Sequence, residues 1–264
     1  MRRWAVTGPE FQLLFDRADR RAPGSSLDDD ALAELYRYPD EPRRRLRTNF
    51  VSSLDGSVQG PDGRSGGLGT PSDQHVFALH RALADAVVVG AGTVRQEGYR
   101  AVDLQPWQRE LRERHGLAPL PTLVVLSGSA RLEPTIARPA EGAGGPVVVV
   151  TTGGKAPGDL DALRDAGVEV LEQEATLDLG AALTTLEERG QRRLLGEGGP
   201  GLHRDLLAAG LVDELSLTLA PVVVAGAGMR STRGPGFERP LACELAFAVL
   251  AGDGTLFTSY RVRG

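Results

Sequence analysis

Three short apolar runs most constrain what this chain can fold into. They cover residues 86–89, 123–126 and 146–150, and no polar residue interrupts any of them. Continuous runs of this kind are typical of strands buried on both faces, as in a parallel sheet that helices cover. Helices expected at 159–166 and 179–190 complete several strand–helix units. The pattern therefore predicts an α/β fold with a mainly parallel sheet.

The two ends of the chain depart from this pattern. Residues 245–250 and 255–262 flank a Gly-Asp-Gly turn, which predicts a C-terminal β-hairpin and hence a mixed sheet. Residues 27–38 predict a helix, and the prolines and arginines that follow predict a linker. We therefore expect an N-terminal extension with a short helix over residues 1–44 and one large domain over residues 45–264.

The region from residue 193 to 221 predicts a strand, a glycine-rich turn, a helix over 201–209 and another strand. The turn holds Gly196, Gly198 and Gly199, and Pro200 suits a first helical position. Free N–H groups and the helix dipole at such a start favour a phosphate. The spacing also matches the G-x-G-x-x-G dinucleotide pattern, but only about sixty residues follow, too few for the rest of a doubly wound sheet. An ordinary tight turn remains an alternative.

Other strand ends carry similar turns. Ser53-Leu54-Asp55-Gly56 follows the expected strand 46–51, and Gly90-Ala91-Gly92-Thr93 follows the strand 86–89. Such turns all fall at one edge of a parallel sheet, where ligands bind. The loop 61–70 is rich in glycine and suits closure over a ligand. Thr70 then predicts the start of a helix that extends to about residue 84 and places Arg81 near its end.

Charge and composition exclude several classes of function. A net charge of −5 gives no electrostatic reason to expect nucleic acid. The single cysteine excludes a disulfide framework and a cysteine zinc cluster, and we expect a cytoplasmic protein without a metal or a membrane span. The only lysine, Lys155, precedes Ala156 where a P-loop needs Ser or Thr, so P-loop phosphoryl transfer is excluded. Schiff-base chemistry would depend on Lys155 alone.

Several motifs occur together in a characteristic order. They are the Ser53–Gly56 turn, the helix that ends at Arg81, and the segments Val89-Gly90-Ala91-Gly92-Thr93-Val94, Glu197-Gly198-Gly199-Pro200, Gly210-Leu211-Val212-Asp213-Glu214 and Ala220-Pro221. In this order they resemble the C-terminal, dihydrofolate-reductase-like domain of the RibD-type pyrimidine reductases of riboflavin biosynthesis. The resemblance covers residues 45 to 262. The zinc signature of the family's fused deaminase half is absent.

The resemblance implies an α/β/α architecture, a homodimer, NADPH as the hydride donor, and a reaction that opens a phosphoribosylamino-uracil to its ribityl form. Substrate contacts are implied for Ser65, Arg81 and Glu197. Cofactor contacts are implied for Val51, Thr93, Glu97, Ser127, Gly198, Gly199, Pro200, Gly201 and Leu202, with Ser129 and Arg131 as weaker assignments.

Hydride transfer also needs a positioned proton donor, a role that suits a carboxyl with a raised pKa. Asp55 and Glu197 are our candidates, and turn capping is the alternative for both. Arg81 is expected to bind a substrate phosphate, or else to satisfy the end of its helix.

The segment after Thr93 leaves the substrate open. The family continues through Asp-Pro to a further Arg, whereas this chain has Glu97-Gly98-Tyr99-Arg100. Arg100 is one replacement for that Arg. A reductase of a pterin or dihydrofolate that uses the same NADPH site is therefore a second hypothesis. A nucleotide-binding protein without turnover is a third.

Overall fold

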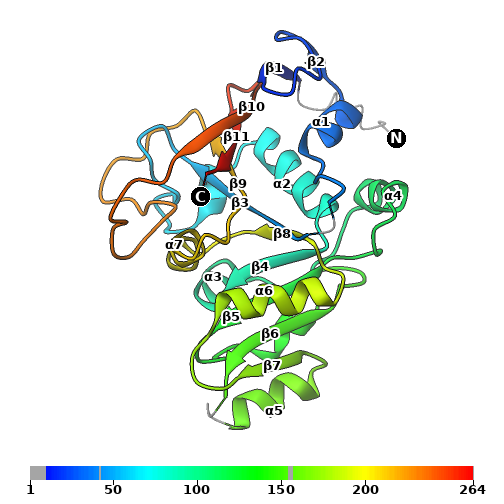
Figure 1. Cartoon of the computed structure of the whole chain (residues 1–264), viewed down its shortest axis with the longest axis vertical. Coiled ribbons are helices and arrows are strands. Elements are labelled where there is room, and N and C mark those ends of the chain that lie inside the picture. The colour runs from blue at the N-terminus through cyan, green and yellow to red at the C-terminus, as the bar shows by residue number, and fades with distance from the viewer. Residues whose placement is uncertain (1–9, 42, 154–156, 264) are drawn as a thin grey trace.

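A computed structural model describes residues 10–41, 43–153 and 157–263 of the chain, so Lys155 lies outside the described residues. Within this part, eleven strands form one sheet in the order β2-β1-β10-β11-β9-β3-β8-β4-β5-β6-β7 (Figure 1). Their bounds are β1 Phe11–Asp16, β2 Ser26–Leu27, β3 Arg45–Ser52, β4 Ala86–Gly90, β5 Thr122–Ser127, β6 Val147–Thr152, β7 Glu169–Gln173, β8 Arg193–Gly196, β9 Glu214–Leu219, β10 Cys243–Ala251 and β11 Leu256–Val262.

The predicted mixed sheet is confirmed. The strands from β9 through β3 and on to β7 run parallel, and β11, β10, β1 and β2 continue the sheet with antiparallel pairings. The described helices are α1 Asp29–Tyr36, α2 Pro71–Leu83, α3 Ala91–Glu97, α4 Pro106–Arg114, α5 Pro157–Asp165, α6 Leu179–Glu188 and α7 Pro200–Ala208, with 3-10 turns at Ser65–Leu68 and Pro134–Ala137.

The apolar runs that predicted the sheet form the centre of two cores. Val87 and Val89 of β4 point into one core with α3 and α5, while Ala86 and Val88 point into the opposite core with α6 and α7. Successive residues of a strand face opposite sides, so a run with no polar residue fits a strand that is covered on both faces. This arrangement gives the three layers of the α/β/α architecture.

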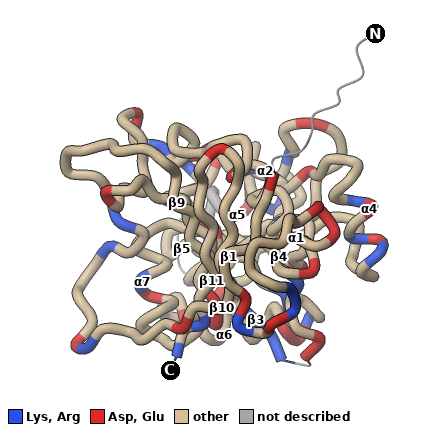
Figure 2. Tube along the Cα trace, turned by 90° about the horizontal axis from the view of Figure 1, so that it is seen from above, with Lys and Arg blue, Asp and Glu red and all other residues tan. Residues whose placement is uncertain are grey.

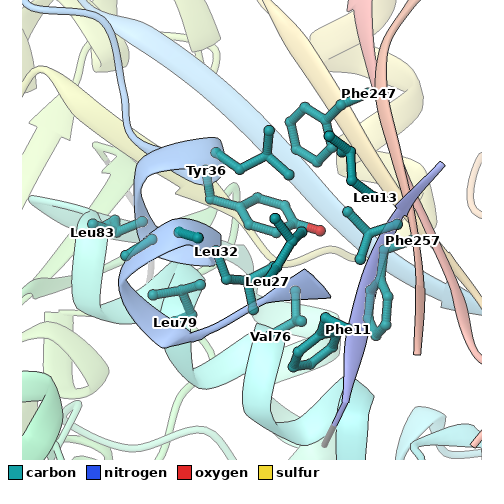
Figure 3. Close-up of a cluster of buried hydrophobic side chains, with 14 of the residues drawn as sticks. Phe11, Leu13, Leu27, Leu32, Tyr36, Val76, Leu79, Leu83, Phe247 and Phe257 are labelled. Carbon is teal, nitrogen blue, oxygen red and sulfur yellow. The ribbon is translucent and has the colours of Figure 1, made fainter. Parts of the chain in front are cut away.

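The N-terminal segment forms a third core with the antiparallel half of the sheet. Phe11 and Leu13 of β1 meet Leu32 of α1, Val76 of α2 and Phe257 of β11 (Figure 3). The sequence analysis predicted the helix but not β1 or β2, because β1 is fixed by its pairing with the distant β10 rather than by a local pattern. The helix starts two residues later than predicted because Asp28 caps it by accepting from the Ala31 N–H.

Arg47 of β3 links this segment to the rest of the sheet. Its side chain is 2% exposed, donates to the Tyr36 carbonyl at 2.8 Å, and pairs with Glu214 of β9 at 2.9 Å. The guanidinium group also lies 4.3 Å from the centre of the Tyr38 ring, within the range of a cation–π interaction. Residues 11–38 are thus packed into the main sheet. The division into a 1–44 extension and a 45–264 reductase domain remains a proposal.

Figure 2 shows that residues of both charges are interspersed along the backbone trace. Arg114 of α4, for example, pairs with Asp30 of α1 at 2.8 Å. None of the helices described here is both long and apolar enough to cross a membrane.

Candidate active site

Two of the predicted glycine turns meet at one edge of the sheet, as expected. β4 and β8 are parallel neighbours, and the Gly90 N–H donates to the Gly198 carbonyl at 3.0 Å where these strands end. Gly198 has a φ of +113°, which favours glycine, and the Gly198–Gly199 peptide bond is cis. A Cβ added to Gly199 would lie 2.6 Å from the Thr93 hydroxyl oxygen. Only a glycine therefore lets these two turns approach so closely.

The turn at β8 leads directly into α7. Gly199 is the N-cap residue, Pro200 follows as the first helical residue, and no side chain caps the helix. The first-turn N–H groups of Gly201 and Leu202 thus belong to a helix start whose dipole favours an anion. Gly90 is the N-cap of α3 and Thr93 is its third residue, so Thr93 does not cap this helix. The Thr93 hydroxyl instead faces the glycine turn.

A cavity of about 500 Å³ opens beside these turns. Nine residues that were assigned to the site from the sequence line it: Val51, Ser65, Arg81, Thr93, Glu97, Glu197, Gly198, Gly199 and Pro200. Arg100 also lines it, together with residues that the sequence analysis did not select, including Asn49, Phe50, Gln59, Asp73, Gln74, Phe77, Tyr99 and Asp103. The fold thus gathers most of the predicted site around one cavity.

A buried ion pair crosses this cavity wall. Arg81 of α2 donates to both carboxylate oxygens of Glu197, from Nε at 2.7 Å and from Nη2 at 2.6 Å. The Tyr99 hydroxyl donates to the same carboxylate at 2.8 Å, and the Arg81 guanidinium stacks 4.4 Å from the centre of the Phe77 ring. Burial opposes the charge of Arg81, but Glu197 outweighs it and raises the Arg81 pKa. Burial and the neighbouring carboxylate also raise the pKa of Tyr99 well above its usual value.

This geometry changes the expectation for Arg81. The sequence assigned the two hydrogen bonds of this guanidinium group to a substrate phosphate. In the structure both are donated to the Glu197 carboxylate. The alternative of a simple helix-end role also fails to describe it, because the partner is a strand-end carboxylate 116 residues away. Glu197 is accordingly held between one cation and one hydroxyl group.

Asp55 does not meet the expectation of a proton donor. It is not among the residues that line the cavity, and its carboxylate accepts from the Ser53 hydroxyl at 2.6 Å and from the Ala225 N–H at 2.7 Å. The Ser53 bond and then the backbone bonds lower the Asp55 pKa to about 2. A carboxyl with so low a pKa holds no proton at neutral pH. The Asp55 carboxylate instead joins the Ser53–Gly56 turn to the distant backbone at Ala225.

Two assigned cofactor residues use their polar groups within the protein. The Glu97 carboxylate accepts the Ser65 N–H at 3.1 Å, which ties α3 to the glycine-rich loop. The buried Ser127 hydroxyl accepts the Ala130 N–H at 2.9 Å and shapes the turn after β5. Ser127, Gly201 and Leu202 are not among the cavity-lining residues, although Leu202 packs beside Gly90.

Among the lining residues that the sequence analysis did not select, Asp73 carries a buried carboxyl. It is the third residue of α2, it is 9% exposed, and it lines the cavity. Burial raises its pKa to about 6, although a hydrogen bond from Thr218 of β9 opposes the shift. An acid in the first turn of a helix is favoured by the helix dipole, so the sequence accounts for Asp73 without a site and gave no local signal of its position at the cavity. A buried carboxyl that titrates near neutrality is typical of a functional group.

Comparison with known proteins gives a family model and relatives that agree with one another. The family model of the RibD C-terminal domain matches residues 44–257. A 2,5-diamino-6-ribosylamino-4(3H)-pyrimidinone 5′-phosphate reductase of Archaeoglobus fulgidus is 30% identical over 178 residues, which are 67% of this chain and 80% of that protein. The protein of the same name from Methanothermobacter thermautotrophicus is 29% identical over 82% of this chain and 97% of its own length.

Among solved structures, a pyrimidine reductase-like protein from Corynebacterium diphtheriae is similar with a TM-score of 0.73 and 28% identity. The similarity covers 84% of this chain and 92% of that one. The riboflavin biosynthesis reductase Rib7 of Saccharomyces has the same fold, with a TM-score of 0.59 at 16% identity over 87% of this chain and 97% of its own.

Proposed function

Because this chain belongs to the RibD C-terminal domain family, we propose that it reduces a ribosylaminopyrimidine 5′-phosphate to the ribityl compound with NADPH. The chain is a reductase of riboflavin biosynthesis on the strength of that family and of the relatives that cover most of its length. One observation supports the specific reaction: the same cavity is lined by the glycine turn at β8, by the held Glu197 carboxylate and by the buried Asp73 carboxyl.

The residues at the glycine turns fit a dinucleotide. The space between Thr93 and Gly199 admits no Cβ, and the start of α7 has no side-chain cap, so backbone N–H groups are left for a diphosphate. NADPH supplies a hydride to the substrate when it is bound. Val51, Thr93 and Gly198 line the adjoining cavity wall and would hold the reactive ring beside Glu197.

Asp73 suits one kind of pyrimidine ring. A 2-amino-4-oxopyrimidine presents two adjacent N–H donors, on N3 and on the 2-amino group, and an ionised carboxylate accepts both in a fork. A uracil replaces the amino donor with a carbonyl oxygen, which a carboxylate repels. With a pKa of about 6, Asp73 is mostly ionised at pH 7 and above. We therefore expect the diaminopyrimidinone to be preferred over the corresponding uracil.

Glu197 is proposed to stabilise the reacting sugar carbon. During the reaction the bond between C1′ and the ring oxygen breaks, C1′ receives the hydride, and the oxygen takes up one proton. C1′ is electron-poor before the hydride arrives, and a fixed carboxylate stabilises that charge best in a site shielded from water. Arg81 and Tyr99 keep Glu197 in one position, so little reorganisation is needed when the charge develops.

The function is tested by following NADPH absorbance with purified protein. The diaminopyrimidinone nucleotide, its uracil analogue and dihydrofolate are offered in parallel. We expect the fastest oxidation with the diaminopyrimidinone and slower oxidation with the uracil. Turnover with dihydrofolate alone would replace the proposal by the pterin hypothesis. NADPH binding without oxidation of any of the three would leave a non-catalytic nucleotide-binding protein.

A dihydropterin is the second candidate substrate because of the charges in the cavity. Arg81 is committed to Glu197, and the lining contains four acidic residues, Asp73, Glu97, Asp103 and Glu197, against Arg81 and Arg100. Such a balance is unfavourable for a substrate phosphate unless Arg100 binds it. A pterin carries the same 2-amino-4-oxopyrimidine edge for Asp73. The parallel assay separates these two substrates directly.

The cofactor site gives a sharper prediction. Gly199→Ala would force a methyl group against the Thr93 hydroxyl, because the new Cβ would lie 2.6 Å from that oxygen. We expect the dissociation constant of NADPH, measured by protein fluorescence quenching, to rise at least about tenfold, which corresponds to roughly 1.4 kcal/mol. Gly236→Ala is the control, since a Cβ there meets no atom within 4 Å. Unchanged NADPH affinity in Gly199→Ala would place the cofactor elsewhere.

We also propose that the protein is a cytoplasmic homodimer, as the family resemblance implies. Exposed apolar side chains on β1 and β10, Leu14, Phe15 and Leu250, support a protein partner on this part of the sheet.

A further inference from the structure

The glycine-rich loop between β3 and α2 borders the cavity. Ser65, Gly66 and Gly69 of this loop line it, and with Gly60, Gly63 and Gly67 the ten positions 60–69 contain five glycines. Glycine loses more conformational freedom on ordering than any other residue. A segment of this composition therefore needs specific contacts to stay in one place over a ligand.

Both ends of the loop are fixed independently of the cavity. At one end, the Val58 N–H donates to the Met229 carbonyl at 2.8 Å, and within the loop the Gly60 N–H donates to the Arg64 carbonyl at 2.8 Å. At the other end, Leu68 is 3% exposed and Thr70 caps α2 by accepting the Asp73 N–H. The stretch from Asp62 to Gly67 lies between these anchors and is mostly exposed.

Two side chains from the end of α3 hold this middle stretch. The Glu97 carboxylate accepts the Ser65 N–H at 3.1 Å, and the Gln96 amide donates to the Gly63 carbonyl. Gln96, Glu97 and Ser65 all line the cavity, so these bonds join two of its walls. The Glu97 bond is the stronger kind, because its acceptor is an ionised carboxylate.

We propose that Glu97 is a positioning residue that latches the glycine-rich loop over the bound substrate, rather than a residue that contacts NADPH. Its carboxylate is engaged by Ser65, so the loop is held closed by a contact that does not involve the cofactor. Removing this bond leaves the Gln96 hydrogen bond and the backbone bond from Gly60 to the Arg64 carbonyl, and shifts the loop towards open conformations. The loss of one hydrogen bond to a charged group is enough to raise the population of the open loop about tenfold. The identity of the substrate rests on the proposed function, but the latch itself does not.

The chain contains a natural reporter of this latch. Arg64 is exposed, and trypsin cleaves the bond between Arg64 and Ser65, whose amide N–H is the group that Glu97 accepts. Cleavage requires the segment to leave its latched conformation, so its rate follows the population of the open loop. Mass spectrometry distinguishes this cut from cuts at other arginines.

The experiment compares Glu97→Ala, Glu97→Gln and the wild type, with Glu110→Ala as control because Glu110 is an exposed acid on α4. In Glu97→Ala we expect cleavage after Arg64 to accelerate about tenfold, and KM for the substrate to rise while the NADPH dissociation constant stays within about twofold. Glu97→Gln retains a carbonyl acceptor for the Ser65 N–H, so its rate of cleavage after Arg64 should be close to that of the wild type. Glu110→Ala should match the wild type.

Two results would overturn the latch. One is an unchanged rate of cleavage after Arg64 in Glu97→Ala. The other is a loss of NADPH affinity in that variant, which would mean that Glu97 contacts the cofactor. Failure of the proposed function looks different: no substrate would be turned over by the wild type, while the cleavage rates would still separate the Glu97 variants.

Discussion

Replacing Arg81 with alanine is expected to abolish turnover and to lower the free energy of unfolding by about 3 kcal/mol, because it leaves a buried carboxylate without its cation. The Glu197 side chain is only 1% exposed and the Arg81 side chain is 23% exposed. Among the described residues, only the hydrogen bond from the Tyr99 hydroxyl to the Glu197 carboxylate would remain. Urea denaturation measures the stability, and NADPH oxidation measures the turnover.

This result separates two roles for Arg81. If its main partner were a substrate phosphate, Arg81→Ala would raise KM for the phosphorylated substrate and leave the free protein stable. The double variant Arg81→Ala/Glu197→Gln provides the control, since it removes the unpaired charge as well. We expect the double variant to regain part of the lost stability but none of the activity, which shows coupling between the two residues. Full stability in Arg81→Ala would disprove the structural pair.

The parts of the fold that could be predicted from the sequence are those with a local cause. The valine run of β4 indicated a strand because every residue in it is apolar, and the glycines after it indicated that the strand ends there. Thr70 and Pro71 marked the start of α2 through the chemistry of a helix N-terminus. Each of these signals lies within a few residues of the feature that it specifies.

The misassigned features depend on contacts between distant segments. β1 is a strand because β10 pairs with it, more than 200 residues along the chain. Arg81 could be placed on a helix end, but its partner Glu197 could not be identified, since helix position says nothing about the neighbouring strand. Asp73 had a sufficient local explanation as an acid in a first turn. Its second role depends on the burial that α2 acquires against β9.

Asp73→Asn is expected to have opposite effects on activity and stability. In the folded protein the Asp73 pKa is about 6, above its usual value of 3.8, because burial makes the ionised carboxylate unfavourable. The native state therefore binds this proton more tightly than the unfolded state, and the penalty appears as pH rises from about 4 through 6 and is constant above that. Two pKa units correspond to roughly 3 kcal/mol. At pH 8 we expect Asp73→Asn to be more stable than the wild type by about 2 kcal/mol, and at pH 4 by little.

Activity should move in the other direction. If ionised Asp73 accepts the two N–H groups of the ring, kcat/KM of the wild type falls about tenfold for each pH unit below 6 and is level above it. Asp73→Asn should lose at least about a hundredfold in kcat/KM, since an amide cannot accept hydrogen bonds from both donors. The fall of kcat/KM below pH 6, which is the acid limb of the profile, should be absent from its remaining activity. The matched control is Asp55→Asn, whose parent carboxylate has a pKa of about 2 and lies outside the cavity lining. That variant should keep the acid limb near pH 6.

The two effects together distinguish a ligand-binding carboxyl from a structural one. A carboxyl that served only to start α2 would stabilise the protein, and its replacement would lower stability and leave the pH profile unchanged. If Asp73→Asn gains stability at pH 8 and loses the acid limb, the buried charge of Asp73 destabilises the folded protein and serves to bind the ring. Stable but fully active Asp73→Asn would remove Asp73 from the site, and with it the preference for a 2-amino ring over a uracil.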